Sequence, residues 1–140
     1  TGMVSSIDPS VVNLLDATPF IPVIAPIGIG EDFKTYNINA DIVAGKIAKI
    51  LQAGKYVVLT NTTGIFDDNG NLIKSMNAEQ VRQLVNKGII SSGMLPKVES
   101  ALEAVSAGVQ NVQIIDGTID HAILLELFTD EGVGTMIRRT

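Results

Sequence analysis

A lysine at the start of an expected helix is the first candidate for chemistry in this sequence. The helix should open at Pro96, because the proline ring presets φ and its missing N–H is one that a first turn leaves unpaired. Lys97 then falls in the first turn, where the helix dipole disfavours a cation by about 0.3–1 kcal/mol. Gly93 just upstream lets the backbone approach a ligand closely. This combination suits a phosphate group, although a surface lysine on an ordinary helix explains it equally well.

A second set of polar residues precedes another expected helix, which should begin near residue 40 and stop at Gly54. Asn39 suits the N-cap of this helix, and Asp41 suits its first turn. Capping does not explain Asn37, and a loop between a strand and a helix is where α/β proteins hold ligands. We expect Asp41 to pair with Lys97, because a carboxylate partner can aim a lysine at a phosphate.

Short apolar runs alternate with amphipathic helices along the chain, which predicts an α/β layer protein with a mainly parallel sheet. Ligands of such sheets lie beyond the carboxyl ends of the strands, so the candidate site gathers residues 37–41, 60–64 and 91–97. The expected strands are 20–27, which we interpret as buried near an edge or bend, 55–60, 112–115 and 135–137, with a strand or lid at 2–7. The expected helices are 11–15 (with Asp8 as N-cap and Pro9 at the first position), 40–53, 78–87, 96–107 and 121–128.

Two glycine-containing segments resemble ligand motifs but fit simpler interpretations. Residues 28–30 read Gly-Ile-Gly, yet the third glycine of a dinucleotide-binding fingerprint would fall at Phe33, so we reject such a site. Residues 67–71 resemble half of a calcium loop, but they lack the required glycine spacing and the distant glutamate. A hairpin turn through Asn69 and Gly70 is the favoured interpretation.

Composition narrows the classes of partner. The 140 residues include ten Lys and Arg against fifteen Asp and Glu, with no basic cluster, so we expect no nucleic-acid partner. The absence of Cys and the single His argue against thiolate chemistry and a His-based metal site. No apolar run approaches the roughly 18 residues of a membrane span, and the N-terminus lacks a signal-peptide layout. We expect a cytoplasmic domain, or half of something larger, with residues ahead of Thr1.

Five segments together resemble the acetylglutamate kinases of the amino acid kinase family. They are Y-N-I-N-A-D at 36–41, L-T-N-x-x-G at 59–64, G-M-L-P-K-V at 93–98, I-I-D-G at 114–117 and H-A-I-L-L-E-L-F-T-D-E-G-V-G-T-M-I at 121–137. The resemblance implies a three-layer αβα sandwich, the amino acid kinase (carbamate kinase-like) fold. It also implies transfer of the γ-phosphoryl group of ATP to the side-chain carboxylate of N-acetyl-L-glutamate, in arginine biosynthesis.

The resemblance further implies roles for individual residues. Asn37 would hold the acetylglutamate, Asp41 would orient the catalytic lysines, and Lys97 would stabilise charge on the transferring phosphoryl group. Mg²⁺ would be held mainly by the nucleotide phosphates rather than by a cage of carboxylates from the chain. The residues implied to surround the nucleotide are Thr60, Asn61, Thr62, Thr63, Gly64, Ile65, Phe66, Ile89, Ile90 and Ser91.

The chain departs from the family in two respects. Phe33 stands where the family commonly has a glycine, which alters the loop before Asn37. The family's N-terminal half, with a second catalytic lysine, glycine-rich phosphate loops and an arginine for the substrate carboxylate, is absent. We therefore expect residues 1–35 to be a remnant of the acceptor-substrate half and residues 36–140 to be the ATP-binding C-terminal domain.

The missing half leaves two readings of this chain. We expect a fragment of a kinase that is inactive alone, from a full-length enzyme that forms a homo-oligomer, either a dimer or a hexamer. The alternative is a nucleotide-binding or arginine-sensing module of the same family without turnover. Residues 128–135 match the members that L-arginine inhibits, so arginine is an expected feedback ligand.

Overall fold

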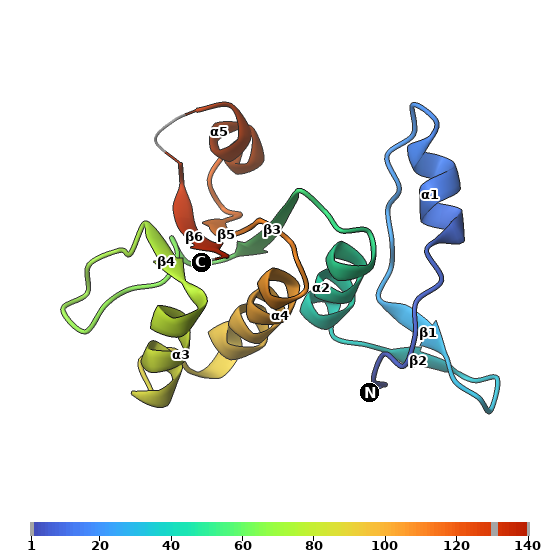
Figure 1. Cartoon of the computed structure of the whole chain (residues 1–140), viewed down its shortest axis with the longest axis horizontal. Coiled ribbons are helices and arrows are strands. Elements are labelled where there is room, and N and C mark those ends of the chain that lie inside the picture. Colours follow the sequence, from blue (N-terminus) through green and yellow to red (C-terminus); the bar gives the residue numbers. More distant parts are fainter. Residues whose placement is uncertain (1, 130–131, 140) are drawn as a thin grey trace.

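The computed structural model describes residues 2–129 and 132–139 (Figure 1). The helices are α1 (Ser10–Asp16), α2 (Ala40–Ile50), α3 (Ala78–Asn86), α4 (Leu95–Ser106) and α5 (Ala122–Phe128), and a short 3₁₀ turn, η1 (Ser92–Met94), precedes α4. The strands are β1 (Ile27–Ile29), β2 (Thr35–Asn37), β3 (Lys55–Thr60), β4 (Ser75–Asn77), β5 (Asn111–Asp116) and β6 (Gly134–Arg138). The expected helices and the three expected strands after residue 50 are thus confirmed, whereas β1, β2 and β4 were missed.

The main sheet has the strand order β3-β5-β6-β4. β3 and β5 run parallel, as do β4 and β6, while β5 and β6 are antiparallel. Helices α2, α3 and α4 lie on one side of this sheet and α5 lies on the other (Figure 1). The arrangement confirms the predicted α/β sandwich, with a mixed sheet in which parallel pairs predominate. The carboxyl ends of β3 and β5 coincide, because Thr60 is the register partner of Asp116.

The core lies between α4 and the sheet. Val98 and Ala101 of α4 are fully buried, as are Ile114 of β5 and Ile137 of β6. The same helix also packs along α2, where a Cβ atom built on Gly45 would collide with the side chain of Ser100. A glycine at position 45 therefore lets the two helices approach closely, which fixes the start of α2 relative to the start of α4.

The prediction of a buried strand at residues 20–27 is wrong. Ile21 and Val23 are 89% and 94% exposed, and regular strand structure begins only at Ile27. Pro22 and Pro26 lack the N–H groups that a central strand needs. Instead of entering the main sheet, the segment crosses one face of α2. Residues 2–7 form no strand either, although the N–H of Gly2 donates to the backbone oxygen of Asn37 at 3.0 Å.

The starts of the two N-terminal helices follow their capping signals to different degrees. The side chain of Asn39 accepts hydrogen bonds from the N–H groups of Asp41 and Ile42, so its predicted N-cap role in α2 is confirmed. In α1 the cap position is Pro9 rather than Asp8. Proline has no side-chain acceptor with which to cap the helix. The carboxylate of the preceding residue, Asp8, instead accepts a hydrogen bond from the Ser10 N–H at 2.9 Å.

Strands β1 and β2 form an exposed antiparallel hairpin beside α2 (Figure 1). Phe33 in its turn has φ +59° and is 90% exposed. A left-handed backbone strains a bulky residue and suits glycine, which explains why glycine is expected at this position. The hairpin closes nonetheless, since the N–H of Phe33 donates to the carbonyl of Gly30 at 2.9 Å.

The predicted turn at residues 67–71 is confirmed. Phe66 and Leu72 form an antiparallel bridge around it, and Gly70 has φ +80°. The Asp67 carboxylate accepts backbone hydrogen bonds from Asn71 and Asn69. These bonds hold the pKa of Asp67 below the usual range, and the bond from Asn71 has the largest effect. Its oxygens therefore serve the turn.

In the described part of the chain, none of the helices has the length and apolar character needed to cross a membrane.

Candidate functional site

The site centres on an ion pair between the first turns of α2 and α4. The Nζ atom of Lys97 lies 2.9 Å from Oδ2 and 3.1 Å from Oδ1 of Asp41. The two side chains are 21% and 20% exposed, so the pair is shielded from water yet open on one side. The pairing expected from the sequence is confirmed, and partial burial makes it stronger than an ordinary surface ion pair.

The backbone of Asp41 is also held from three directions. Its N–H donates to the Asn39 side chain at 2.9 Å. Its carbonyl accepts from the Ser100 hydroxyl at 2.7 Å and from the Tyr56 hydroxyl at 3.2 Å. Sequence reasoning missed Ser100 and Tyr56. The one available signal was that Ser100 follows Lys97 by three positions, which places both on one face of α4.

Tyr56 is a buried member of this network. Its side chain is 7% exposed, and its hydroxyl lies 3.1 Å from the Ser100 hydroxyl. Burial raises the pKa of the Tyr56 phenol, and the nearby negative charge of Asp41 adds to that rise, while the hydrogen bond with Ser100 opposes it. The phenol therefore stays neutral and able to donate a hydrogen bond at neutral pH.

Asn37 lies at the end of β2, four residues before Asp41 in the chain, and it is exposed. Its backbone is tied to β1 and to Gly2, so the hairpin and the N-terminal segment together fix its place. Asn37, the residue expected to hold the acceptor, thus lies just before the N-terminus of α2, where Asp41 pairs with Lys97.

A cleft of about 330 Å³ separates the loop after β3 from the segment before α4. Both segments that the sequence assigned to the nucleotide meet there, although Thr60, Asn61 and Thr63 do not line it. Met94, on its wall, is the N-cap of α4, the helix that carries Lys97 in its first turn. The residues that line it are Thr62, Gly64, Ile65, Phe66, Asp67, Ile89, Ile90, Ser91 and Met94.

The cleft wall at Gly64 and Ile65 is anchored by Thr135 of β6. The Thr135 hydroxyl accepts from the Ile65 N–H at 2.8 Å and donates to the Ile73 carbonyl at 2.7 Å. Gly64 has φ +152°, and a Cβ atom there would lie 2.6 Å from the Thr135 hydroxyl oxygen. The contact requires a glycine at position 64. The sequence alone gave no signal that linked Thr135 to this loop.

The turn before α4 differs from the expected glycine bend. The left-handed residue is Ser92, with φ +49°, rather than Gly93. In the described chain no atom would lie within 4 Å of a Cβ atom on Gly93, so no protein neighbour requires a glycine there. The bend thus lies one residue before the expected position, at Ser92, which is also the first residue of the 3₁₀ turn.

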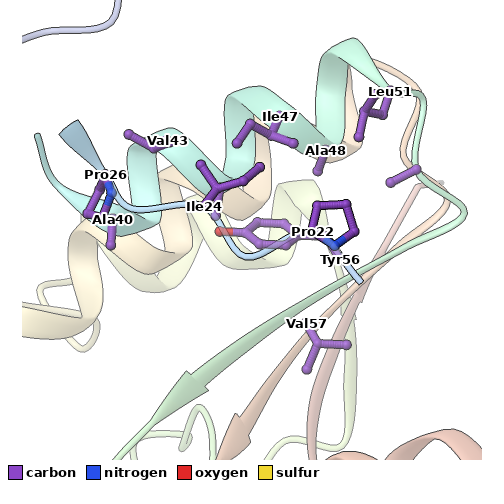
Figure 2. A pocket seen from close by; sticks show the side chains of 12 residues that line it. Pro22, Ile24, Pro26, Ala40, Val43, Ile47, Ala48, Leu51, Tyr56 and Val57 are labelled. Carbon is purple, nitrogen blue, oxygen red and sulfur yellow. The ribbon is translucent and has the colours of Figure 1, made fainter. Parts of the chain in front are cut away.

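A second cavity, of about 430 Å³, lies between the segment 22–26 and α2 (Figure 2). Figure 2 shows the side chains of Pro22, Ile24, Ile47 and Tyr56 around it. Its lining is almost entirely apolar, so it offers packing surface rather than groups for catalysis. The ring of Tyr56 separates it from the hydrogen bonds on Asp41.

Residues 2–129 and 132–139 contain no group of three or more Asp, Glu or His side chains suited to holding a metal ion.

The comparisons with known proteins give the family. The model of the amino acid kinase family matches residues 1–116. The chain belongs to the amino acid kinase family. It is 56% identical over 137 residues to an acetylglutamate kinase of Nitrosomonas eutropha, which covers 98% of this chain and 46% of that protein. The chain thus spans about half the length of the curated relatives it matches.

Solved structures share the fold. The chain matches N-acetylglutamate synthase from Neisseria gonorrhoeae, solved with coenzyme A and L-arginine, with a TM-score of 0.77 at 34% identity over 84% of this chain and 27% of that one. It matches carbamate kinase from Giardia lamblia, bound to AMP-PNP, with a TM-score of 0.62 at 19% identity over 79% of this chain and 36% of that one. The amino acid kinase fold expected from the sequence is confirmed.

Proposed function

We propose that this chain supplies the nucleotide-binding half of an acetylglutamate kinase. In that role it takes part in transfer of the γ-phosphoryl group of ATP, carried as its Mg²⁺ complex, to the side-chain carboxylate of N-acetyl-L-glutamate. The Asp41–Lys97 ion pair carries the proposal, because it places a fixed cation in the first turn of the helix whose N-cap residue, Met94, lines the cleft. The identity to acetylglutamate kinases along nearly the whole chain supports the choice of acceptor.

The residues of the chain match what phosphoryl transfer demands. The reaction needs positioning and neutralisation of charge on the phosphoryl oxygens more than covalent help from the protein. Lys97 supplies the charge and Asp41 aims it, while Asn37 holds the acceptor and the cleft between residues 62–67 and 89–94 takes the nucleotide. The division into an acceptor remnant at 1–35 and a nucleotide domain from 36 belongs to the same proposal, although β2 spans that boundary.

The proposal is tested by adding the N-terminal part of a relative, which the match to this chain does not cover. The purified chain should show no turnover alone, and it should form acyl phosphate, trapped as a hydroxamate, when co-expressed with the N-terminal half of the N. eutropha relative. Turnover by the chain alone contradicts the expected inactivity. Nucleotide binding without any turnover in a stable complex of the two halves favours the binding-module alternative.

A second candidate function, arginine sensing, rests on a separate cavity of about 460 Å³ between β5, β6 and α5, which Lys55 and Lys74 also line. Gln113 lines it at 4% exposure, and its Oε1 atom has no hydrogen-bond partner within the described residues. Glu126, on the opposite wall, accepts from the Val133 N–H at 2.8 Å. Such acceptors suit a guanidinium, which carries only donors.

The sensing proposal is tested by calorimetry with L-arginine and with L-citrulline, which has similar size without the charge. We expect binding of arginine alone, and its loss in Glu126→Gln. Equal responses to both ligands, or to neither, contradict the proposal.

A further inference from the structure

Two buried hydroxyls and one carbonyl form a compact network beneath the ion pair. The Ser100 hydroxyl lies 2.7 Å from the Asp41 carbonyl oxygen, and the Tyr56 hydroxyl lies 3.2 Å from the same oxygen. The two hydroxyl oxygens are 3.1 Å apart. Ser100 is 5% exposed and Tyr56 is 7% exposed, so water does not compete for these groups.

The number of hydroxyl protons limits which hydrogen bonds this network can contain. The two hydroxyls have one proton each for three short contacts. The shortest contact, from Ser100 to the Asp41 carbonyl, takes the serine proton. The Tyr56 proton then goes either to the same carbonyl or to the Ser100 oxygen, and in both cases Tyr56 reinforces the hold on Asp41.

Helix α4 therefore grips Asp41 at two points. Lys97 and Ser100 are three positions apart, on one face of the helix. Lys97 binds the carboxylate and Ser100 binds the carbonyl of the same residue. The close approach of the helices at Gly45 permits both contacts, since a side chain there would push Ser100 away.

This grip determines where the charge of Lys97 lies. The Asp41 side chain has only two rotatable bonds, so fixing its backbone leaves the carboxylate little freedom. An ammonium bound to both carboxylate oxygens is then fixed as well. A displacement of about 1 Å at such a group can slow a reaction by about 100-fold.

We propose that Ser100 and Tyr56 are positioning residues that, through the backbone carbonyl of Asp41, aim the Lys97 ammonium at the transferring phosphoryl group. The proposal rests on the proposed kinase function, but the geometry of the ion pair can be tested without turnover. Both hydroxyls are buried and bound to the Asp41 carbonyl, so their effect reaches the reaction through Asp41 and Lys97.

The first experiment observes the ion pair directly. Ammonium groups held in an ion pair give lysine ¹H–¹⁵N NMR signals, and Lys97 is assigned in the 140-residue chain by its loss in Lys97→Ala. We expect this signal to be broadened or lost in the double variant Tyr56→Phe, Ser100→Ala. Ser106→Ala, which removes an exposed hydroxyl from the same helix, should leave it unchanged. So should Val109→Ala, which destabilises the fold by removing fully buried methyl groups elsewhere.

The second experiment uses turnover in the complex with the supplied half. The double variant should lower kcat by about 10- to 100-fold while the KM for nucleotide stays within about twofold, because the cleft is untouched. Tyr56→Phe alone should lose less, since Ser100 keeps its contact with Asp41. Val109→Ala is the control for lost stability, because it destabilises the fold without touching the contacts that position Lys97.

The outcomes separate the two proposals. A Lys97 signal and a kcat that both survive the double variant overturn the positioning role. If Lys97→Ala itself leaves kcat unchanged, the kinase assignment of Lys97 fails. In that case, loss of the Lys97 signal in the double variant still supports the hold of the two hydroxyls on the ion pair.

Discussion

The ammonium of Lys97 lies 2.9 Å from a carboxylate oxygen of Asp41, although the two residues are 56 positions apart in the chain. Each stands in the first turn of a helix, where the dipole contributes roughly half a positive charge. The carboxylate cancels the lysine, while the two helix starts leave a local excess of positive potential. The pair is therefore stable without a ligand and still attracts an anion.

Removal of this cation should act on turnover rather than on acceptor binding. In the complex of this chain with the N-terminal half of the N. eutropha relative, Lys97→Ala should lower kcat by about two to three orders of magnitude, the usual loss for one preorganised transition-state donor. Lys97→Arg should rescue little, because a planar fork does not reproduce a compact point charge. The KM for acetylglutamate should change little, because we propose that Asn37, rather than Lys97, contacts the acceptor.

The Asp41→Asn variant tests whether the pair acts as one unit. It should also slow turnover, and the losses in Lys97→Ala and Asp41→Asn should be non-additive in the double variant, because each change disables the same clamp. Lys49→Ala, which removes a half-exposed lysine from the same helix α2, serves as the control. Near-normal kcat in Lys97→Ala, or losses that simply add, would falsify the proposed clamp.

Gly64 should be required for nucleotide binding. A methyl group there would lie 2.6 Å from the Thr135 hydroxyl oxygen and 2.8 Å from Leu72, at a φ of +152°. Gly64→Ala must therefore displace the loop that lines the cleft. We expect the purified chain to bind a non-hydrolysable ATP analogue weakly in calorimetry, and we expect Gly64→Ala to lower that affinity at least about tenfold, equivalent to about 1.4 kcal/mol.

Gly54→Ala, in the connection between α2 and β3, is the matched control for Gly64→Ala. In the described chain no atom would lie within 4 Å of its added methyl group, so nucleotide binding should remain. Unchanged affinity in Gly64→Ala with a folded protein would place the nucleotide elsewhere.

Local rules account for most of the fold. Lys55–Thr60 begins and ends as the β-rich run predicts, and the helix predicted at residues 40–53 starts at its predicted N-cap, Asn39. The Asp41–Lys97 pair was also expected from the sequence, because both residues were placed at helix starts near the carboxyl edge of the sheet.

The remaining features depend on tertiary contacts that have no local signature. The apolar composition of residues 20–27 indicates burial, but burial requires neighbours on all sides, and Ile21 and Val23 of this segment stay 89% and 94% exposed. In the sequence Ser100 is an ordinary helical serine, and its role becomes visible only in the structure, where it packs against Gly45 of α2. Tyr56 likewise gains a role only because α2 brings the Asp41 carbonyl within 3.2 Å of its hydroxyl.

Relief of the left-handed conformation at Phe33 should stabilise the protein. A left-handed backbone costs a non-glycine residue roughly 1–2 kcal/mol, while glycine adds about 0.5–1 kcal/mol of unfolded-state entropy. Phe33→Gly should therefore raise the free energy of unfolding by up to about 1 kcal/mol, or the Tm by about 2–4 °C. Thermal unfolding followed by circular dichroism measures this change.

Phe33→Ala distinguishes strain from the loss of an exposed ring. It removes the ring, which is 90% exposed, but keeps the Cβ atom that the φ of +59° disfavours. It should therefore change the Tm by much less than Phe33→Gly. Equal gains in both variants contradict the explanation by backbone strain.

The buried Tyr56 phenol predicts how stability falls at alkaline pH. Burial raises its pKa in the folded state, first by desolvation and further by the charge of Asp41. In the unfolded chain a tyrosine ionises near its ordinary pKa of about 10. Above that pH the unfolded state therefore releases a proton that the folded state retains. This contribution to stability is complete below about pH 10 and is lost as the pH rises towards the raised pKa of the folded protein.

The measurement is the free energy of unfolding in urea from about pH 8 to 11, compared between the wild-type chain and Tyr56→Phe. The decline above about pH 10 should be shallower in Tyr56→Phe, because phenylalanine cannot ionise. Ser100→Ala should keep the steep decline, since the Tyr56 ring stays buried and loses only the hydrogen bond that lowers its pKa. Parallel curves for the wild type and Tyr56→Phe would show that the phenol ionises alike in both states, and that its burial does not shift its pKa.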